Sequence, residues 1–593
     1  MQNTRTLLNK NWQWRLVSTI SADKKQLPES VDLSQWQEAQ HSPSEIYLEL
    51  LSRKLLPDYN VGQNERRIQW EAANSGHKHV ELFFEGLDTF ATVILNGEQI
   101  AKSENQFIPF PADVSKTLVE SGAKDNELII LFESAERMGI ELEKKWGGRT
   151  SLIRDKKRMN MRKAQYSWGW DWGPKILNAG PHLPVYLETY DNRVDNLSVT
   201  STLSDNLDST KLSVQGADWI PSNNLAPTMT RERYFAWIRM AQKSNVNMIR
   251  VWGGGYYETE DFWDACDDHG IMIWQDYMLA CGYYPIHSRF LESIRKEAEL
   301  QTIRLPRMCS IGLIRRGVDQ LLTTRRLVTC INGMDYHTLS GRFISEFGMH
   351  GYPDMRTVNV FCPDPADRHP QSQTIDCHNK GEGAEKRIAR YMAENFRYTN
   401  DLEIYAYVSQ LVQSEAYGLN EIFAHNTTTE KQDFILVIKA FDLYTENFVE
   451  YENDSRQVSL LPGQNTDLGT LTNPSAVDAD SLIILSANLI DGNGAVVARF
   501  VDWPEPFRYL NWPKGTKLTT TILTRPEADG WETVEIESNN PIKGFLLDVE
   551  SGEMPEWEDN MVDLLPGDKV QVRVKCLEGR KITFRWLSDW EHK

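Results

Sequence analysis

The sequence lacks the features of several large protein classes. Its 593 residues contain no apolar run of about 20, the length that a membrane-spanning helix needs, so no membrane association is expected. Basic residues number 64 against 84 acidic ones, and the formal net charge of -20 argues against a nucleic-acid partner, which needs a basic surface. The N-terminal stretch MQNTRTLLNKNWQW has no apolar core of signal-peptide length, which predicts an intracellular, cytoplasmic protein.

Cysteine is scarce, and the motifs of several common enzyme classes are missing. The seven cysteines are scattered and odd in number, as expected in a reducing compartment. The sequence has no G-x-S-x-G elbow and no phosphate-binding loop, and Gly253–Gly255 lacks the lysine of such a loop and indicates a tight turn. One Cys/His cluster occurs without zinc-site spacing, so neither a metal nor another cofactor is expected; its members are Cys362, His369, Cys377 and His378.

Tryptophan, in contrast, is abundant. The chain has 19 tryptophans, and Trp168, Trp170 and Trp172 surround Asp171 in the stretch YSWGWDWGP. Neither the alternation of a strand nor the three-to-four spacing of a helix fits this stretch. Indole faces stack on sugars, so the composition points to carbohydrate binding, and a β-rich core built with tryptophan explains it equally well.

The first part of the chain is expected to be a β-sandwich. Apolar and polar residues alternate in two runs between His79 and Ile100, where Asn96-Gly97 is a typical hairpin pair. A closing strand is expected at Val185–Leu187, so the sandwich takes up about 190 residues. From about residue 430 the pattern returns to short alternating strands, which predicts one or two immunoglobulin-like sandwiches.

Between these β regions, strands and helices are expected to alternate. A short strand begins near Gly216, helices are expected at 231–243 and 258–269, and strands at 246–252 and 271–277. This alternation is typical of a parallel sheet. A (β/α)8 barrel is favoured, and a doubly wound sheet also fits these repeats.

Candidate catalytic residues follow from the rule that active-site groups lie at the carboxyl ends of barrel strands. The rule selects Trp252, Gln275 and Asp276, and also Glu346 in the run RFISEFG. Glu346 could face the barrel mouth, or it could form a surface salt bridge at a strand end. The local pattern leaves both interpretations open.

Five motifs together carry a family resemblance: YSWGWDWGP, GADWIPSNN, IRVWGGGYYE, IWQDY and RFISEFGMHGYPDM, in this order. They resemble the β-mannosidases of glycoside hydrolase family 2, and most closely the fungal β-mannosidase B type. The resemblance implies retaining exo-hydrolysis of terminal non-reducing β-D-mannose from a small β-mannoside or manno-oligosaccharide substrate. It makes Glu346 the nucleophile and assigns Trp170, Asp171, Trp172 and Trp252 to substrate binding.

The resemblance also implies a multidomain architecture. The expected order is an N-terminal β jelly roll at 1–190, a remnant of an immunoglobulin-like domain at 191–215, an incomplete (β/α)8 TIM-type barrel at 216–425, and immunoglobulin-like β-sandwiches at 426–500 and 501–593. The tryptophan loop of the jelly roll is expected to cover the barrel mouth, where indoles stack on the sugar and Asp171 accepts hydrogen bonds from its hydroxyl groups.

The chain departs from this family at the acid/base residue. In the family this residue is a glutamate after asparagine, well before the nucleophile, yet no glutamate occurs between Glu299 and Glu346. The corresponding segment, 304–327, is rich in arginine and has the composition of a reading-frame shift or a mispredicted splice. Residues are also missing from the second domain and from the stretch after Gly418, where the family has its last barrel strand.

Two hypotheses therefore remain, and in both the acid/base residue is unknown. The first is a retaining β-mannosidase. The second is a catalytically inactive sugar-binding protein or defective product of a β-mannosidase gene.

Overall fold

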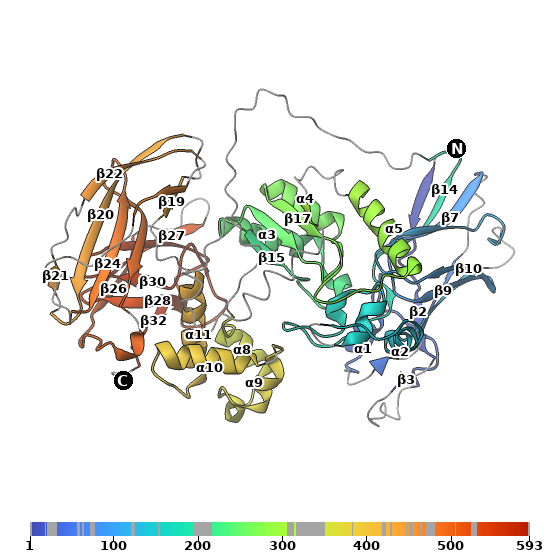
Figure 1. Ribbon diagram of the computed structural model, residues 1–593, viewed down its shortest axis with the longest axis horizontal. Coiled ribbons are helices and arrows are strands. Elements are labelled where there is room, and N and C mark those ends of the chain that lie inside the picture. Colours follow the sequence, from blue (N-terminus) through green and yellow to red (C-terminus); the bar gives the residue numbers. More distant parts are fainter. Residues whose placement is uncertain are drawn as a thin grey trace. The chain divides into compact units, whose positions relative to one another are not determined.

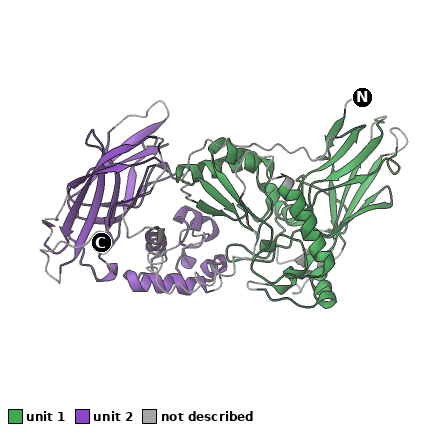
Figure 2. Cartoon of the chain, turned by 45° about the horizontal axis from the view of Figure 1, so that its top comes forward, with its two compact units in different colours: residues 1–207, 214–325 green, residues 208–213, 326–593 purple. Residues whose placement is uncertain are grey.

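The computed structural model describes residues 3–17, 19–20, 32–55, 60–61, 64–70, 77–119, 125–151, 155–193, 216–304, 313–315, 350–381, 383–417, 423–426, 428, 430–445, 447–449, 455–462, 465–469, 481–504, 506–523 and 530–590. The chain divides into two compact units (Figure 2). One comprises Met1–Leu207 with Val214–Arg325, and the other comprises Asp208–Ser213 with Arg326–Lys593.

The first unit begins with a sandwich of two antiparallel sheets (Figure 1). Leu128, Ile130 and Phe132 alternate along strand β12 and are fully buried between the sheets, as the alternating pattern requires. One sheet has the order β1 (Thr4–Leu7), β14 (Val185–Tyr190), β7 (His79–Phe84), β11 (Phe110–Asp113); the other has the order β10 (Glu98–Ser103), β9 (Ala91–Leu95), β12 (Asn126–Phe132), β6 (Asn64–Trp70), β2 (Gln13–Leu16), β4 (Gln37–Glu38).

The expected hairpin is present at Asn96-Gly97, which joins β9 to β10. Both residues have positive φ, 51° and 87°, as a tight hairpin turn between twisted strands requires. Strand β14 is the expected closing strand and runs three residues further, to Tyr190. Short elements complete this region: β3 (Thr19–Ile20) pairs with β5 (Asn60–Val61), β8 (Leu87–Asp88) pairs with β13 (Gly180–Pro181), and helix α1 spans Ile46–Ser52.

Between β12 and β14 the chain leaves the sheets and forms a long excursion. It contains helix α2 (Ala135–Trp146) and the 3-10 turns η1 (Lys156–Asn160) and η2 (Gln165–Ser167). The Ser134 hydroxyl caps α2 by accepting a hydrogen bond from the Arg137 amide. The tryptophan-rich stretch follows η2 directly, so a β-sandwich presents this stretch on an irregular loop.

The first unit continues with a parallel sheet, of which the described strands have the order β15 (Gly216–Trp219), β16 (Met248–Val251), β17 (Met272–Asp276), β18 (Leu313–Arg315). The connections carry η3 (Ala226–Thr228), α3 (Arg231–Lys243), α4 (Glu260–His269) and α5 (Ser288–Arg304). Figure 1 shows α3 and α4 beside β15 and β17. The expected strand–helix alternation is confirmed for these elements, and all the strands run in the same direction, so their carboxyl ends share one edge.

The second unit combines helices with antiparallel sheets. Helices α10 and α11 share an apolar core with the β-sheet residues Phe441 and Ile484 and with Trp503, which follows β25. The helices are α8 (Met355–Phe361), α9 (Gln373–His378), α10 (Ala384–Asn395) and α11 (Leu402–Tyr417), with the 3-10 turns η5 (Pro365–Asp367) and η6 (Phe507–Tyr509). The strands are β19 (Phe423–His425), β20 (Gln432–Asp442), β21 (Asn447–Val449), β22 (Ser455–Leu460), β23 (Asn465–Asp467), β24 (Ile483–Ile490), β25 (Val496–Asp502), β26 (Leu518–Ile522), β27 (Trp531–Ser538), β28 (Ile542–Val549), β29 (Glu556–Trp557), β30 (Val562–Leu564), β31 (Val570–Lys575) and β32 (Ile582–Arg585).

Several sequence expectations concern residues outside the described ranges. Glu346 and the run RFISEFG lie there, as do most of the arginine-rich segment 304–327 and of the interdomain segment 191–215. Within the described ranges, no helix has both the length and the apolar character that membrane crossing requires.

Candidate functional site

The stretch Tyr166–Pro174 forms a compact turn rather than a strand or helix. Gly169 has φ 85°, a conformation that glycine adopts without strain, and its amide donates to the carbonyl of Tyr166 at 2.9 Å. The Trp170 amide donates to the Gly173 carbonyl at 3.0 Å, which closes the turn around Asp171. The turn therefore fixes the two flanking indoles and leaves Asp171 exposed at its tip.

The three tryptophans of this turn have different surroundings. Trp168 is 1% exposed and packs with Phe90, Met161 and Leu177 beneath helix α2. Trp170 and Trp172 belong to a separate apolar cluster that includes Trp252 and the parallel sheet. Trp168 therefore belongs to the core of the excursion, whereas Trp170, which is 4% exposed, and the partly buried Trp172 belong to the core at the parallel sheet.

Trp170 and Trp172 meet Trp252 at the carboxyl edge of the parallel sheet. Trp252 follows β16, and its ring centroid lies 4.8 Å from that of Trp170 and 6.2 Å from that of Trp172. The interplanar angles are 68° and 76°, so both contacts are edge-to-face, a favourable arrangement for aromatic pairs. Tyr166 stacks on Trp172 with centroids 5.5 Å apart. These four rings form what we call the indole cluster: Tyr166, Trp170, Trp172 and Trp252.

Backbone hydrogen bonds hold the turn against the Gly253–Gly255 loop. The Tyr166 amide donates to the Gly254 carbonyl at 3.0 Å, and the Tyr166 hydroxyl donates to the Asn224 carbonyl at 3.2 Å. A Cβ atom on Gly254 would lie 1.9 Å from the Trp252 ring. Glycine is thus required for this close approach, in agreement with the interpretation of this loop as a tight turn.

Arg158 packs against the indole cluster. Its guanidinium lies 5.2 Å from the ring centroid of Trp170, within the range of a cation–π contact. The same group donates to the carbonyls of Ala280 and Cys281 at 2.9 and 2.7 Å. Arg158 is fully buried, and through these contacts it connects the tryptophan turn to the segment after β17.

The strand-end residues Gln275 and Asp276 lie at the same edge and are buried. Asp276 Oδ2 accepts hydrogen bonds from Arg250 Nη2 at 2.7 Å and from the Gly253 amide at 3.3 Å. Arg250 also contacts Asp218 at 3.2 Å. Asp276 therefore acts as an anchor for Arg250 and for the glycine loop, which is a structural role.

Glu258 is a buried carboxyl group that sequence reasoning did not select. It is 1% exposed and accepts hydrogen bonds from Trp219 Nε1 at 2.8 Å and from the Tyr234 hydroxyl at 2.5 Å. Burial raises the pKa of Glu258 to about 7, while these two hydrogen bonds oppose the shift. The available signal was its place at the end of IRVWGGGYYE, directly after two tyrosines. The bonds fix Trp219, the last residue of β15, against α3.

A buried ion pair joins the sandwich excursion to helix α5. Arg162 Nη2 lies 2.6 Å from Glu297 Oε1, and Arg162 Nε donates to Oε2 at 3.0 Å. Both side chains are 2% exposed. The Tyr257 hydroxyl also donates to Glu297 at 2.9 Å, and Arg162 donates to the Met278 carbonyl at 2.8 Å. This network therefore sets how the tryptophan turn meets the sheet edge.

Of the residues assigned by resemblance, the structure brings Trp170, Trp172 and Trp252 together, and Asp171 lies on the same turn. Glu346 lies outside the described residues. Residues that sequence reasoning missed are Tyr166, Arg158 and Asn224, although Tyr166 and Asn224 stand inside two of the quoted motifs. The four members of the Cys/His cluster are described, and His378 there stacks on Phe361 with ring centroids 3.9 Å apart.

Two parts of the chain match known domain families. Residues 14–182 match the glycosyl hydrolase 2 galactose-binding domain-like family, and residues 420–509 match the mannosidase Ig/CBM-like domain. In sequence, the chain is 27% identical over 870 aligned positions to a protein named beta-mannosidase B from Thermothelomyces thermophilus, with 98% of this chain and 99% of that relative covered. A protein of the same name from Emericella nidulans is 25% identical over 852 positions, with 97% and 98% covered.

The alignment with the Thermothelomyces protein contains long gaps. It exceeds the 593 residues of the chain by 277 positions, although nearly all of both sequences is covered. The missing positions are therefore internal, in agreement with the expected internal deletions.

Solved structures resemble the fold. The β-D-mannosidase of Dictyoglomus thermophilum matches with a TM-score of 0.79 and 21% identity, covering 99% of each chain. The exo-chitosanase of Amycolatopsis orientalis matches with a TM-score of 0.60 and 12% identity, covering 98% of this chain and 99% of that one. At these identities the likeness concerns the fold alone.

Proposed function

We propose that this chain, which belongs to glycoside hydrolase family 2, is a β-mannosidase that removes terminal non-reducing β-D-mannose with retention of configuration. The family match and the curated beta-mannosidase B relatives support a glycosidase. Beyond this, we propose the substrate, a small β-mannoside or manno-oligosaccharide, and the retention of configuration.

The indole cluster is the observation that carries this proposal. Trp170 and Trp252 come from distant segments and meet edge to face at an interplanar angle of 68°. Each is 4% exposed, so the two rings offer a sugar subsite their accessible edges. Asp171 is exposed on the same turn, where a carboxylate can accept hydrogen bonds from sugar hydroxyl groups. Each such charge-assisted bond contributes roughly 1.5–3 kcal/mol.

We further propose that β15 to β18 are the first strands of a (β/α)8 barrel. Their parallel order and the helices between them support this architecture. In such a barrel the edge that carries Trp252 is the one where substrates bind. The boundaries expected from the sequence, with the jelly roll at 1–190 and the barrel at 216–425, are part of the same proposal.

The proposed chemistry is a double displacement at the anomeric carbon. The Glu346 carboxylate attacks this carbon while the glycosidic oxygen leaves with a proton, and water then hydrolyses the glycosyl ester. Retaining glycosidases need a second carboxyl group roughly 5–5.5 Å from the first, which supplies that proton and then activates the water. The acid/base residue is not assigned in this chain.

Two described carboxyl groups near the sheet edge, those of Asp276 and Glu258, do not suit the acid/base role. Asp276 binds Arg250 and the Gly253 amide. Glu258 has a raised pKa, as a general acid requires, yet it is 1% exposed and its oxygens accept from Trp219 and Tyr234. The carboxyl groups of both residues are used in hydrogen bonds that stabilise the fold.

A second candidate function is sugar binding without turnover. It is favoured by a specific observation, the absence of any glutamate between Glu299 and Glu346. The indole cluster does not distinguish the two functions, because a lectin-like protein would use the same rings.

Hydrolysis of an aryl β-mannoside separates the candidates. The aryl group leaves without much help from an acid, so the first step needs only the nucleophile. The proposal expects release of the phenol, with β-mannose as the first product by proton NMR, and loss of release in Glu346→Gln. Glu299→Gln is the matched control, because Glu299 is an exposed partner of Arg295 on α5. Mannose binding without any phenol release supports the lectin-like function, and full activity in Glu346→Gln contradicts the nucleophile assignment.

A further inference from the structure

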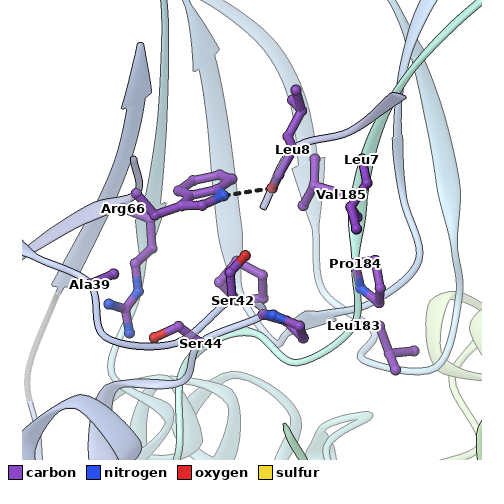
Figure 3. A pocket seen from close by; sticks show the side chains of 12 residues that line it. Leu7, Leu8, Ala39, Ser42, Ser44, Arg66, Leu183, Pro184 and Val185 are labelled. Atoms are coloured by element: carbon purple, nitrogen blue, oxygen red, sulfur yellow. Dashed lines mark hydrogen bonds between the residues drawn. The ribbon is translucent and has the colours of Figure 1, made fainter. Parts of the chain in front are cut away.

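A small cavity lies between the two sheets of the N-terminal sandwich, apart from the indole cluster (Figure 3). Its volume is about 40 Å³. The walls are mostly apolar and come from the end of β1 and the residues after it, from β6, from the stretch before α1 and from the segment that leads into β14. The lining residues include Leu7, Leu8, Ala39, Ser42, Arg66 and Val185.

One charged side chain, Arg66, lines this cavity. It stands between Asn64 and Ile68 on the inward face of β6 and is 1% exposed. None of its guanidinium nitrogens has a hydrogen-bond partner within the described part of the chain. Its guanidinium lies 6.0 Å from the ring centroid of Trp14.

Arg67, the next residue, shows how a satisfied arginine on this strand looks. It points to the other face of the sheet, where its Nε donates to Gln13 Oε1 at 2.9 Å. Its guanidinium also lies 4.2 Å from the ring centroid of Trp36. The two arginines lie on the same strand but on opposite faces. Arg66 therefore lacks hydrogen-bond partners because its side chain faces inward.

The carboxyl groups near Arg66 are occupied elsewhere. Glu49 accepts hydrogen bonds from the amides of Gln40 and His41, at 2.9 and 3.2 Å, and from the Ser44 hydroxyl. Glu45 Oε2 accepts a hydrogen bond from Asn178 Nδ2 at 3.0 Å, and burial and the nearby Asp88 raise the pKa of Glu45, which disfavours its charged form. Burial also lowers the pKa of Arg66, to about 10, at which the guanidinium keeps its charge. Leaving buried N–H donors of a cation unpaired is costly.

Size limits what can fill the cavity. A cavity needs roughly 10–15 Å³ to hold one water molecule. This cavity, with about 40 Å³, therefore accommodates about three waters or a group of three to four heavy atoms. A sugar ring does not fit. A planar carboxylate matches the fork of a guanidinium with two parallel hydrogen bonds, and a methyl group suits the apolar walls.

We propose that this cavity binds a small monocarboxylate of formate or acetate size, with its carboxylate on the Arg66 guanidinium and its apolar end against Leu8 and Val185. Ser42 and Leu7 are solvent-exposed and mark the side from which the ligand enters. This site is independent of the proposed glycosidase activity, because none of its residues belongs to the indole cluster.

Acetate binding to the full chain tests the site without any assay of activity. Saturation-transfer NMR of the acetate methyl group, in a carboxylate-free buffer, is expected to give a signal that saturates. For a ligand of four heavy atoms the dissociation constant is expected to be no tighter than roughly tens of micromolar. The melting midpoint should rise by on the order of a few degrees in saturating sodium acetate relative to sodium chloride of equal ionic strength.

Three variants give the readout its specificity. Arg66→Met removes the guanidinium and is expected to abolish the saturable signal. Ala39→Leu fills the cavity while keeping Arg66, and it gives an independent loss if the first variant folds poorly. Arg67→Met, on the outward face of the same strand, is the matched control and should retain the signal.

Three results would overturn the proposal. One is a wild-type chain with no saturable acetate signal at tens of millimolar, which indicates that ordered water alone fills the cavity. Another is an unchanged signal in Arg66→Met or in Ala39→Leu. The third is displacement of acetate by equimolar chloride, which indicates a halide site instead of a carboxylate site.

Discussion

The indole rings of Trp170 and Trp252 meet edge to face, with centroids 4.8 Å apart. One ring comes from the excursion of a β-sandwich, and the other follows a strand of the parallel sheet. The contact therefore joins the two structural layers through aromatic rings that are each only 4% exposed. Because Arg158 and the backbone of Tyr166 hold the two sides, this contact is formed before any ligand binds.

Replacing Trp252 by Ala is expected to lower kcat/KM for an aryl β-mannoside roughly 10–100-fold, since a ring of the subsite is lost and each factor of ten is about 1.4 kcal/mol. Trp170→Ala should behave alike. Trp168→Phe is the control from the same turn: it should lower the melting midpoint and leave KM unchanged, because Trp168 packs beneath α2. Equal kinetic losses in all three variants would contradict the division of roles within the turn.

Asp171→Asn tests the carboxylate at the tip of the turn. The side chain is exposed, so the change should leave stability within about 0.5 kcal/mol. Loss of the charge-assisted bonds is expected to lower kcat/KM roughly 10–150-fold. Circular dichroism melts and steady-state kinetics on the same preparation separate these effects. Unchanged kinetics would remove Asp171 from the substrate site.

The Arg162–Glu297 ion pair is expected to contribute strongly to the free energy of unfolding, because it holds the excursion against α5. Removing one partner of a buried pair leaves an uncompensated charge, so Arg162→Met should cost roughly 3–5 kcal/mol of unfolding free energy. Arg162→Met with Glu297→Met should regain much of this loss, which a double-mutant cycle in denaturant measures. Additive losses would show that the two side chains do not act as a pair.

Glu258 is expected to make the free energy of unfolding depend on pH. Its pKa is about 7 in the folded chain against an ordinary value of 4.5, so the folded state binds the proton more tightly. The resulting stabilisation is complete below pH 4.5 and is lost as pH rises through 7. Relative to Glu258→Gln, wild type should therefore lose roughly 3 kcal/mol of unfolding free energy across this window.

The comparison with Glu258→Gln cancels other buried groups. His182, for example, has a pKa lowered by burial to about 4 and contributes the opposite slope, because its stabilisation is lost as pH falls. Both proteins carry that term equally. A difference between them that is flat from pH 4.5 to 7 would contradict the burial of an ionisable Glu258.

Much of the fold around the site could be predicted from local pattern. Asn96-Gly97 fixed a hairpin because both positions need positive φ, and the 231–243 helix was expected with the bounds that α3 has. The 246–252 strand matches β16, since a short buried apolar run between two helices favours a parallel strand.

The division of the tryptophan turn could not be predicted in the same way. Trp168, Trp170 and Trp172 are spaced evenly, and no periodic rule tells which indole enters a core when the backbone is irregular. The bond from the Tyr166 amide to Gly254, and the positive φ of Gly169, decide it. Such contacts between distant segments leave no local signal in one sequence.

Arg66 shows a different limit. Alternation along NERRIQW places it on the face of Ile68, yet an arginine at such a position is normally expected on the outside. The alternation pattern and the usual exposure of arginine thus give opposite predictions for Arg66. Only the packing of β6 shows that the side chain is buried and that a cavity lies beside it.

The most direct test of the proposed β-mannosidase activity is covalent trapping with a 2-deoxy-2-fluoro-β-mannosyl fluoride, followed by peptide mass spectrometry. Fluoride leaves without an acid, so the step requires only the nucleophile and the sugar subsite. The account predicts one fluoromannosyl residue attached to Glu346, and strongly slowed labelling in Trp252→Ala. No adduct, or an adduct on another carboxylate, would contradict it.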